Sequence, residues 1–252
     1  MSREIGKRQV TIRQLLLWTL TSAGMMTYCR LMPLGTMIPE QTTLYLTFTL
    51  FFSGLGGASL AGLLWLTPSV LRGEVAKRAP GEILLMAVGV LIIMDCAIGA
   101  WLAATRDLDA FDLRWFTPDS LACHRARVVW FCVFAVPIFL AAGLICRGDL
   151  AWRLALLVPI VPCVVWGTAT YVDRQTAGLG FFVGQRDPVV WLQFLSPILP
   201  AVLLAFVVAR DWRREPRSAG HWLGVILFMI IAGKVLETAC WDSMFHILSP
   251  WP

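Results

Sequence analysis

The chain has little charge for its length. Of its 252 residues only 15% are Asp, Glu, Lys or Arg, whereas 58% are hydrophobic. Charged residues make up nearer a quarter of a soluble domain, so this composition excludes an ordinary soluble globular protein. The basic residues, which give a net charge of +5, fall in short segments between long apolar runs. Such segments set the orientation of membrane helices, and we therefore predict no nucleic-acid partner.

Histidine is also scarce, since only His124, His221 and His246 occur. His221 and His246 stand at opposite ends of one apolar run, so they cannot ligate a haem as a pair at matched depth. We expect no haem, no covalently bound cofactor and no metal site. The seven cysteines form no CxxC pair, which leaves no argument for an iron–sulfur cluster or a disulfide framework. P-loop, HExxH and GxSxG motifs are absent as well.

Long apolar runs are what the chain has in abundance. About twenty apolar residues cross a bilayer as a helix. We predict an all-α integral membrane protein, a seven-transmembrane helix bundle forming one domain over 14–248. The predicted spans are 14–34, 44–66, 82–104, 128–146, 152–171, 189–209 and 222–245. The first run contains Arg30 and could instead be a re-entrant or interfacial helix. Prolines in the fifth and sixth runs, such as Pro159, should kink those helices.

The basic residues also predict the orientation of the bundle. Residues 1–13 carry four of them and are expected to form a cytoplasmic tail. The loops that would then be cytoplasmic are 67–81, 147–151 and 210–220. The C-terminus would lie outside, together with the loops in which acidic residues offset arginine, 35–43, 105–127 and 172–187. We expect this arrangement in a bacterial cytoplasmic (inner) membrane.

Three charged residues lie deep inside the apolar runs. Lys234 and Glu237 are three residues apart and share one helix face. Asp95 lies at a similar depth, roughly 20 Å from the inner end of its own run at about 1.5 Å per residue. A charge at that depth is costly unless it is paired or faces water, so we predict a functional site at Asp95, Lys234 and Glu237. The alternative is a structural ion pair that fixes helix register.

Two further features are candidates for packing or binding. Gly54, Ala58 and Gly62 recur every four residues in the second run, and small residues at this spacing let another helix approach closely. They form a packing seam or else make room for a flat cofactor or substrate. The longest loop, 105–127, mixes arginine and aspartate and includes Arg106 and His124. It is a docking or substrate-binding surface, or simply a solvated interfacial loop.

Three stretches carry a resemblance to a known family. They are YLTFTLFFSGLGGASLAGLLWL in the second run, ATRDLDAF after the third, and WGTATYVDRQTAG through RDPVVWLQFLSPILPAVLLAF. Together, over roughly 40–210, they resemble the polysulfide-reductase and dimethyl-sulfoxide-reductase membrane anchor families. The chain departs from that pattern where Asp107 follows Arg106, since the family often has Pro there. It also has seven predicted spans, whereas the family often has eight or more.

The resemblance implies a membrane subunit without a redox centre of its own. Such a subunit binds menaquinol or ubiquinol near the outer face and passes electrons to an iron–sulfur subunit. It also anchors a molybdenum-containing catalytic subunit. On this hypothesis Asp95, Glu237 and Tyr171 handle quinol or protons, and loop 105–127 docks the partner.

Other functions fit the same residues. A secondary transporter or ion-coupled carrier would use Asp95, Lys234 and Glu237 near the membrane midplane, although the chain shows no internal repeat. A retinal-type seven-helix protein would use Lys234 for the Schiff base and Asp95 as its counter-ion. An assembly or scaffold subunit would use these charges for structure alone.

Overall fold

The computed structural model describes residues 12–31, 42–74, 78–105, 118–147, 149–176, 195–196, 198–212 and 218–232. Throughout these ranges the regular structure is helical, which confirms the all-α prediction. The helices are α1 (Ile12–Leu31), α2 (Thr42–Leu71), α3 (Pro80–Thr105), α4 (Pro118–Ile145), α5 (Leu150–Leu157), α6 (Ile160–Thr176), α8 (Ile198–Trp212) and a last apolar helix, Ala219–Ala232.

Four helical segments are long and apolar enough to cross a membrane. They are Ser53–Leu71, Pro80–Leu102, Ala126–Ile145 and Leu150–Val172, and they match the second to fifth predicted runs. Their outward faces carry large apolar side chains, among them Leu64, Val133 and Val164, each at least half exposed. Apolar outward faces on apolar helices are what lipid contact requires, so length, composition and surface together identify a membrane protein.

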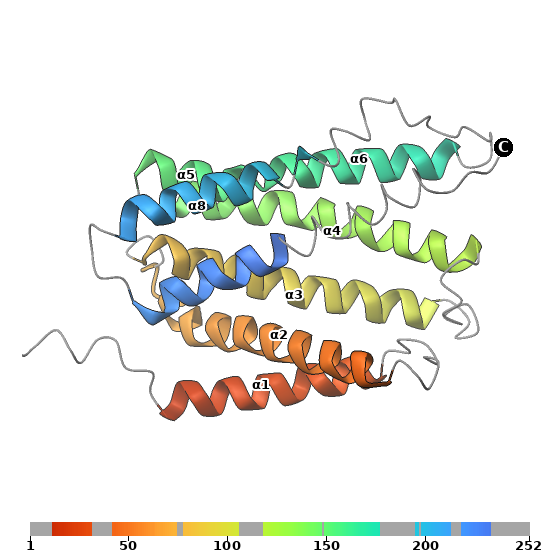
Figure 1. Ribbon diagram of the computed structural model, residues 1–252, viewed down its shortest axis with the longest axis horizontal. Coiled ribbons are helices and arrows are strands. Elements are labelled where there is room, and N and C mark those ends of the chain that lie inside the picture. The colour runs from red at the N-terminus through yellow and green to blue at the C-terminus, as the bar shows by residue number, and fades with distance from the viewer. Residues whose placement is uncertain are drawn as a thin grey trace, which may run out of the picture.

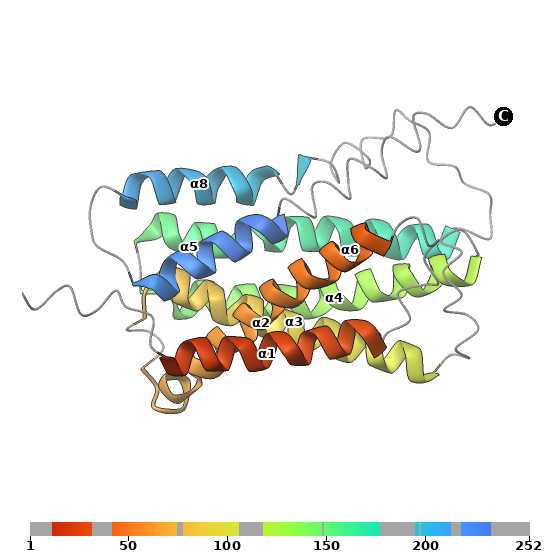
Figure 2. The same cartoon turned by 60° about the horizontal axis from the view of Figure 1, so that its bottom comes forward.

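Along the long axis of the bundle α6 continues the direction of α5, and the other successive helices run in alternate directions (Figure 1). α2 packs between α1 and α3, and α4 packs on α3, α5 and α6. α1, α3, α5 and the last helix begin at the end of the bundle where α2, α4 and α8 finish (Figures 1 and 2). The described residues of three predicted loops, 67–81, 147–151 and 210–220, therefore lie at one end.

Two helix boundaries differ from the apolar runs, each for a physical reason. α4 begins at Pro118 rather than at Val128, because hydropathy marks where a helix is apolar and not where it starts. Pro118 suits a first helical position, where its missing N–H is not needed. Part of the predicted loop 105–127 is therefore helical. The fifth run divides into α5 and α6 around Pro159, as expected for a residue that cannot donate to the helix ladder.

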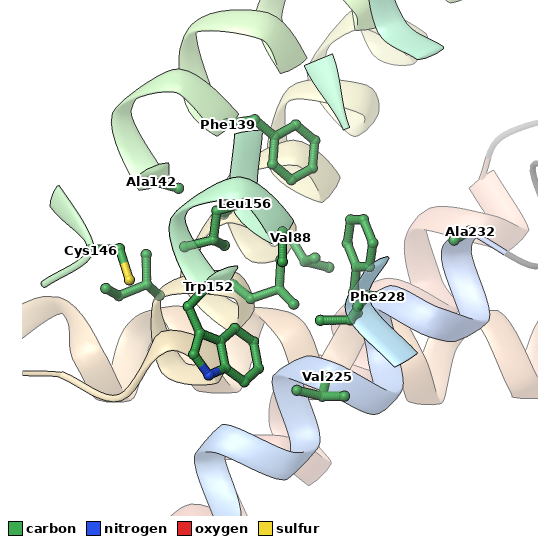
Figure 3. Packing of buried hydrophobic residues seen from close by; sticks show 14 of the residues in the cluster. Val88, Phe139, Ala142, Cys146, Trp152, Leu156, Val225, Phe228 and Ala232 are labelled. Carbon is green, nitrogen blue, oxygen red and sulfur yellow. The ribbon is translucent and has the colours of Figure 1, made fainter. Parts of the chain in front are cut away.

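The largest hydrophobic core joins α3, α4, α5, α8 and the last helix. Figure 3 shows Trp152 of α5 beside Val225 and Phe228 of the last helix, with Val88 of α3 between them and Phe139 of α4. The rings of Phe139 and Phe228 meet edge to face, with centroids 5.9 Å apart. This core joins the last helix to four other helices and so positions the polar groups at its start.

Candidate functional site

Asp95 forms a two-pronged ion pair with Arg127. Asp95 lies on α3 and Arg127 on α4, where the two helices pack together. Arg127 Nε donates to Oδ1 at 2.8 Å and Nη2 donates to Oδ2 at 2.5 Å. A guanidinium bound to a carboxylate in this paired geometry is stronger and more specific than a single contact. The pair therefore fixes the position of both charges.

Tyr28 of α1 lies next to this pair. Its hydroxyl donates to the backbone carbonyl of Cys96, the residue after Asp95, at 3.1 Å. Gly99 makes this approach possible, because a Cβ atom there would lie only 2.7 Å from the Tyr28 hydroxyl oxygen and 4.0 Å from Arg127 Cζ. Three helices thus bring a carboxylate, a guanidinium and a phenol together. We call Asp95, Arg127 and Tyr28 the ion-pair site.

Asp95 and Arg127 of the ion-pair site lie within apolar helical segments, and their side chains are partly exposed. Asp95 is seven residues, about 10 Å, before Leu102, and Arg127 is the second residue of Ala126–Ile145. Their side chains keep 33% and 41% of their surface exposed. The pair can therefore meet a ligand, and it offers one proton acceptor together with several donors.

Apolar and aromatic side chains flank the ion-pair site on α3 and α4. Ile98 and Leu102 of α3 form a small buried cluster with Ala126, and Phe134 packs against it. Trp130 stacks on Phe134 with ring centroids 6.2 Å apart, and it meets Trp101 edge to face at 6.4 Å. An amphiphilic ring with polar oxygens would find both kinds of surface here.

A second group of polar residues lies at the opposite end and is buried. His221, at the start of the last helix, is 0% exposed. Its Nδ1 accepts a 3.0 Å hydrogen bond from the backbone N–H of Gly81. The first N–H groups of a helix have no partner inside it, so His221 caps the start of α3. Its ring also meets Trp152 and Trp222 edge to face, with centroids 5.1 Å apart in each case.

Glu82 links the start of α3 to α2 and to the last helix. It is buried, and it accepts a 2.6 Å hydrogen bond from the hydroxyl of Ser218. Arg78 lies 3.8 Å from its other oxygen and also donates to the hydroxyl of Ser69 on α2. A buried carboxylate requires such partners, because burying a charge without them is costly.

Trp152 links α5 to α8 in the same region. Its Nε1 donates to the buried carboxylate of Asp211 at 2.7 Å. Arg210 lies 3.5 Å from that carboxylate and also pairs with Asp149, whose side chain caps α5. We call the buried groups of this end the polar-end cluster; its members are Glu82, Trp152, Asp211, Ser218 and His221. Its packing and hydrogen bonds suit a structural role.

The structure places part of the predicted site. Asp95 is held by Arg127, whereas Lys234 and Glu237, like Arg106, lie outside the described residues. His124 belongs to α4, and Tyr171 is a half-exposed residue of α6. The contacts described for Asp95 do not include Tyr171. No group of three or more His, Cys, Asp or Glu residues suited to a metal occurs within the described part of the chain.

The small residues of α2 are divided between two neighbouring helices. Gly54 lies against α1, where its carbonyl accepts a 3.0 Å hydrogen bond from Trp18 Nε1. Ala58 is buried beside Leu85 of α3. A Cβ atom on Gly62 would lie 2.5 Å from Leu85 Cγ. Leu85 therefore fills the space beside Gly62 that a flat cofactor would need.

Sequence reasoning missed Arg127, Tyr28 and the polar-end cluster. Arg127 was assigned to a loop, although its place one residue before the apolar run was a signal that it could reach an intramembrane carboxylate. Tyr28 and His221 gave no such signal, because their partners are backbone groups of α3. No family model, curated protein or solved structure matches the chain.

Proposed function

We propose that this chain is the membrane subunit of a respiratory redox complex and that its ion-pair site handles quinol and protons. The observation that carries this proposal is the accessible Asp95–Arg127 pair between apolar helices. An ionisable pair at such a position is costly to keep in a membrane, which favours a functional role. Its partial exposure favours contact with a ligand.

The chemistry of the ion-pair site suits a quinol headgroup. Oxidation of a quinol releases two electrons, which the proposed iron–sulfur partner would accept, and two protons. A carboxylate within hydrogen-bond reach can accept one of these protons. Asp95 supplies that carboxylate. Arg127 and Tyr28 supply donors for the quinol oxygens, and Arg127 balances the charge of Asp95 before the proton arrives. The apolar cluster of Ile98, Leu102 and Phe134 supplies a surface for the ring.

For the whole chain we propose seven spans with the N-terminus in the cytoplasm and the C-terminus outside. The alternating helix directions support this topology (Figure 2). So does the charge of the end that holds the polar-end cluster, where Arg72, Arg147 and Arg153 are exposed. The ion-pair site is then nearer the outer face, and its protons would be released on that side. Iron–sulfur and molybdenum-containing subunits are the proposed partners.

An ion-coupled carrier is the second candidate, because the same exposure of Asp95 would suit binding of an ion or a protonated substrate. The retinal hypothesis is less favoured, since Arg127 already balances the charge of Asp95. A scaffold role would leave the ion-pair site without a measurable activity. These candidates are distinguished by one set of measurements.

The test combines co-purification with quinol oxidation. Tagged chain is purified from its native membrane, co-purifying subunits are identified by mass spectrometry, and oxidation of decylubiquinol and a menaquinol analogue is followed. We expect iron–sulfur and molybdenum-containing partners, and at least a tenfold loss of quinol oxidation in Asp95→Asn. The matched control is Asp149→Asn at the other end, which keeps a helix-capping side chain on α5 and should leave the rate unchanged.

Two results would contradict the proposal. A complete complex in which Asp95→Asn oxidises quinol at the normal rate would remove the ion-pair site from the reaction. A chain without redox partners that drives solute flux in liposomes, with flux lost in Asp95→Asn, would show a carrier instead.

A further inference from the structure

Two cysteines from different helices meet inside the bundle. Cys132 lies on α4 and Cys163 on α6, where these two helices pack together and bring the two thiols next to each other. Cys132 is 7% exposed, and Cys163 is partly buried. They are 31 positions apart in the chain, so their contact depends entirely on how α4 and α6 pack.

Gly167, one turn after Cys163, makes the contact close. A Cβ atom at Gly167 would lie 3.0 Å from the Cβ of Cys132 and 3.7 Å from its Sγ. Because Gly167 has no side chain, the side chain of Cys132 lies directly against the backbone of α6. The fold thus holds the side chain of Cys132 against α6, one helical turn from Cys163.

Cys96 and Cys146 lie in different surroundings. Cys146 is fully buried in the core beside α5, and its carbonyl accepts a hydrogen bond from Arg153. Cys96 is beside the ion-pair site, where its carbonyl accepts from Tyr28.

We infer that Cys132 and Cys163 are a redox-active dithiol that closes to a disulfide between α4 and α6 by reducing a quinone dissolved in the bilayer. Two S–H bonds break and one S–S bond forms. The two electrons and two protons released convert one quinone to one quinol, so the reaction balances without another reactant. A thiol in direct contact with its partner needs little movement to close the bond, whose geometry demands close Cβ atoms.

A quinone is the fitting oxidant because of where the thiols lie. Both are in apolar segments, Ala126–Ile145 and Leu150–Val172, away from water-soluble oxidants. A quinone accepts electrons and protons in the same pairs that a dithiol gives up, and it reaches the thiols through the lipid. The dithiol is separate from the ion-pair site, so each can be tested without the other.

The experiment uses the full chain in native membranes. Membranes are reduced, freed of reductant, exposed to decylubiquinone, alkylated, denatured and digested with trypsin. Cleavage after Arg147 and Arg153 separates fragment 128–147, which holds Cys132, from fragment 154–174, which holds Cys163. We expect the two fragments to be joined by a bond that reductant cleaves, with about one quinol formed per joined chain because the couple exchanges two electrons.

Variants of single cysteines show which two thiols form the disulfide. Fragment 128–147 also contains Cys146, so Cys146→Ser is the control and should keep the joined fragments. Cys132→Ser and Cys163→Ser should each abolish them. Cys132→Ala and Cys163→Ala are made in parallel, and a normal gel-filtration profile shows which variants are folded.

The inference is overturned if decylubiquinone leaves the two fragments separate in the folded wild-type chain. A parallel sample treated with copper phenanthroline shows why. Joining by copper phenanthroline alone means that the thiols are adjacent but that a quinone does not oxidise them, and no joining at all means that the thiols do not meet. Because the readout is a bond between named fragments, neither result bears on the quinol-oxidation assay.

Discussion

The charged residues are buried at one end of the bundle and partly exposed at the other. In the polar-end cluster Glu82 and Asp211 are each 5% exposed, and His221 is 0% exposed. In the ion-pair site Asp95 and Arg127 keep 33% and 41% of their side chains exposed. Buried polar groups are tolerated only with partners, and five helices supply them at the first end. An exposed pair can exchange partners, so the second end is where a ligand can act.

The hydrogen bonds at the two ends also connect different parts of the fold. Trp152 and His221 use theirs to join helices that are distant in sequence, α5 to α8 and the last helix to α3. Asp95 and Arg127 satisfy each other across one helix contact. Loss of a member of the first group should therefore cost stability, whereas loss of a member of the second should chiefly cost activity.

The largest expected effect is that of Trp152→Ala. This side chain is 1% exposed, and its removal leaves a cavity in the core and takes a donor from Asp211. Replacing a buried Trp by Ala costs about 3–5 kcal/mol. The free energy of unfolding is measured by reversible denaturation in mixed detergent micelles. Trp101→Ala, at a 53% exposed position, is the control and should cost about 1 kcal/mol, because it loses only its edge-to-face contact with Trp130. Equal losses at the two positions would contradict a rigid polar end.

A smaller loss is expected when the cap on α3 is removed. His221→Phe keeps a ring between Trp152 and Trp222 but leaves the Gly81 N–H without its acceptor, which costs about 1–3 kcal/mol. His221→Asn keeps an acceptor near the position of Nδ1 and should recover part of that stability. Unfolding free energy and hydrogen exchange of the Gly81 amide are measured together. Equal exchange rates in the two variants would show that His221 does not cap α3.

The bundle's helices could largely be predicted from the sequence, because a helix in lipid must be apolar over a fixed length. The third to fifth runs, 82–104, 128–146 and 152–171, agree with the described spans to within two residues, and the second run, 44–66, overlaps Ser53–Leu71. The start of α4 at Pro118 could not be found this way, since residues such as Asp119 and Arg125 are polar yet helical. The error mattered because it assigned Arg127 to a loop and hid the partner of Asp95.

Of the ion-pair site, only Asp95 could be predicted. The cost of a charge inside an apolar run singles out that residue whatever its neighbours are. Tyr28, Arg127 and the contact between Cys132 and Cys163 depend on how each helix is rotated about its axis. Rotation is set by close approaches such as that of Gly99 to Tyr28, and a single sequence gives no measure of them.

The smallest expected effect on stability comes from the ion pair itself. A double-mutant cycle compares Asp95→Asn, Arg127→Gln and the double variant by the same unfolding measurement. Because both side chains are about a third or more exposed, we expect a coupling energy on the order of 1 kcal/mol, well below the 3–5 kcal/mol lost when a fully buried pair is broken. A coupling energy of about 3–5 kcal/mol would mean that the pair stabilises the fold, as the polar-end cluster does. The quinol assay on the same variants would then be expected to follow the fraction of folded chain. A coupling energy near the smaller figure, with activity lost while the chain stays folded, would mean that the pair is kept for its chemistry.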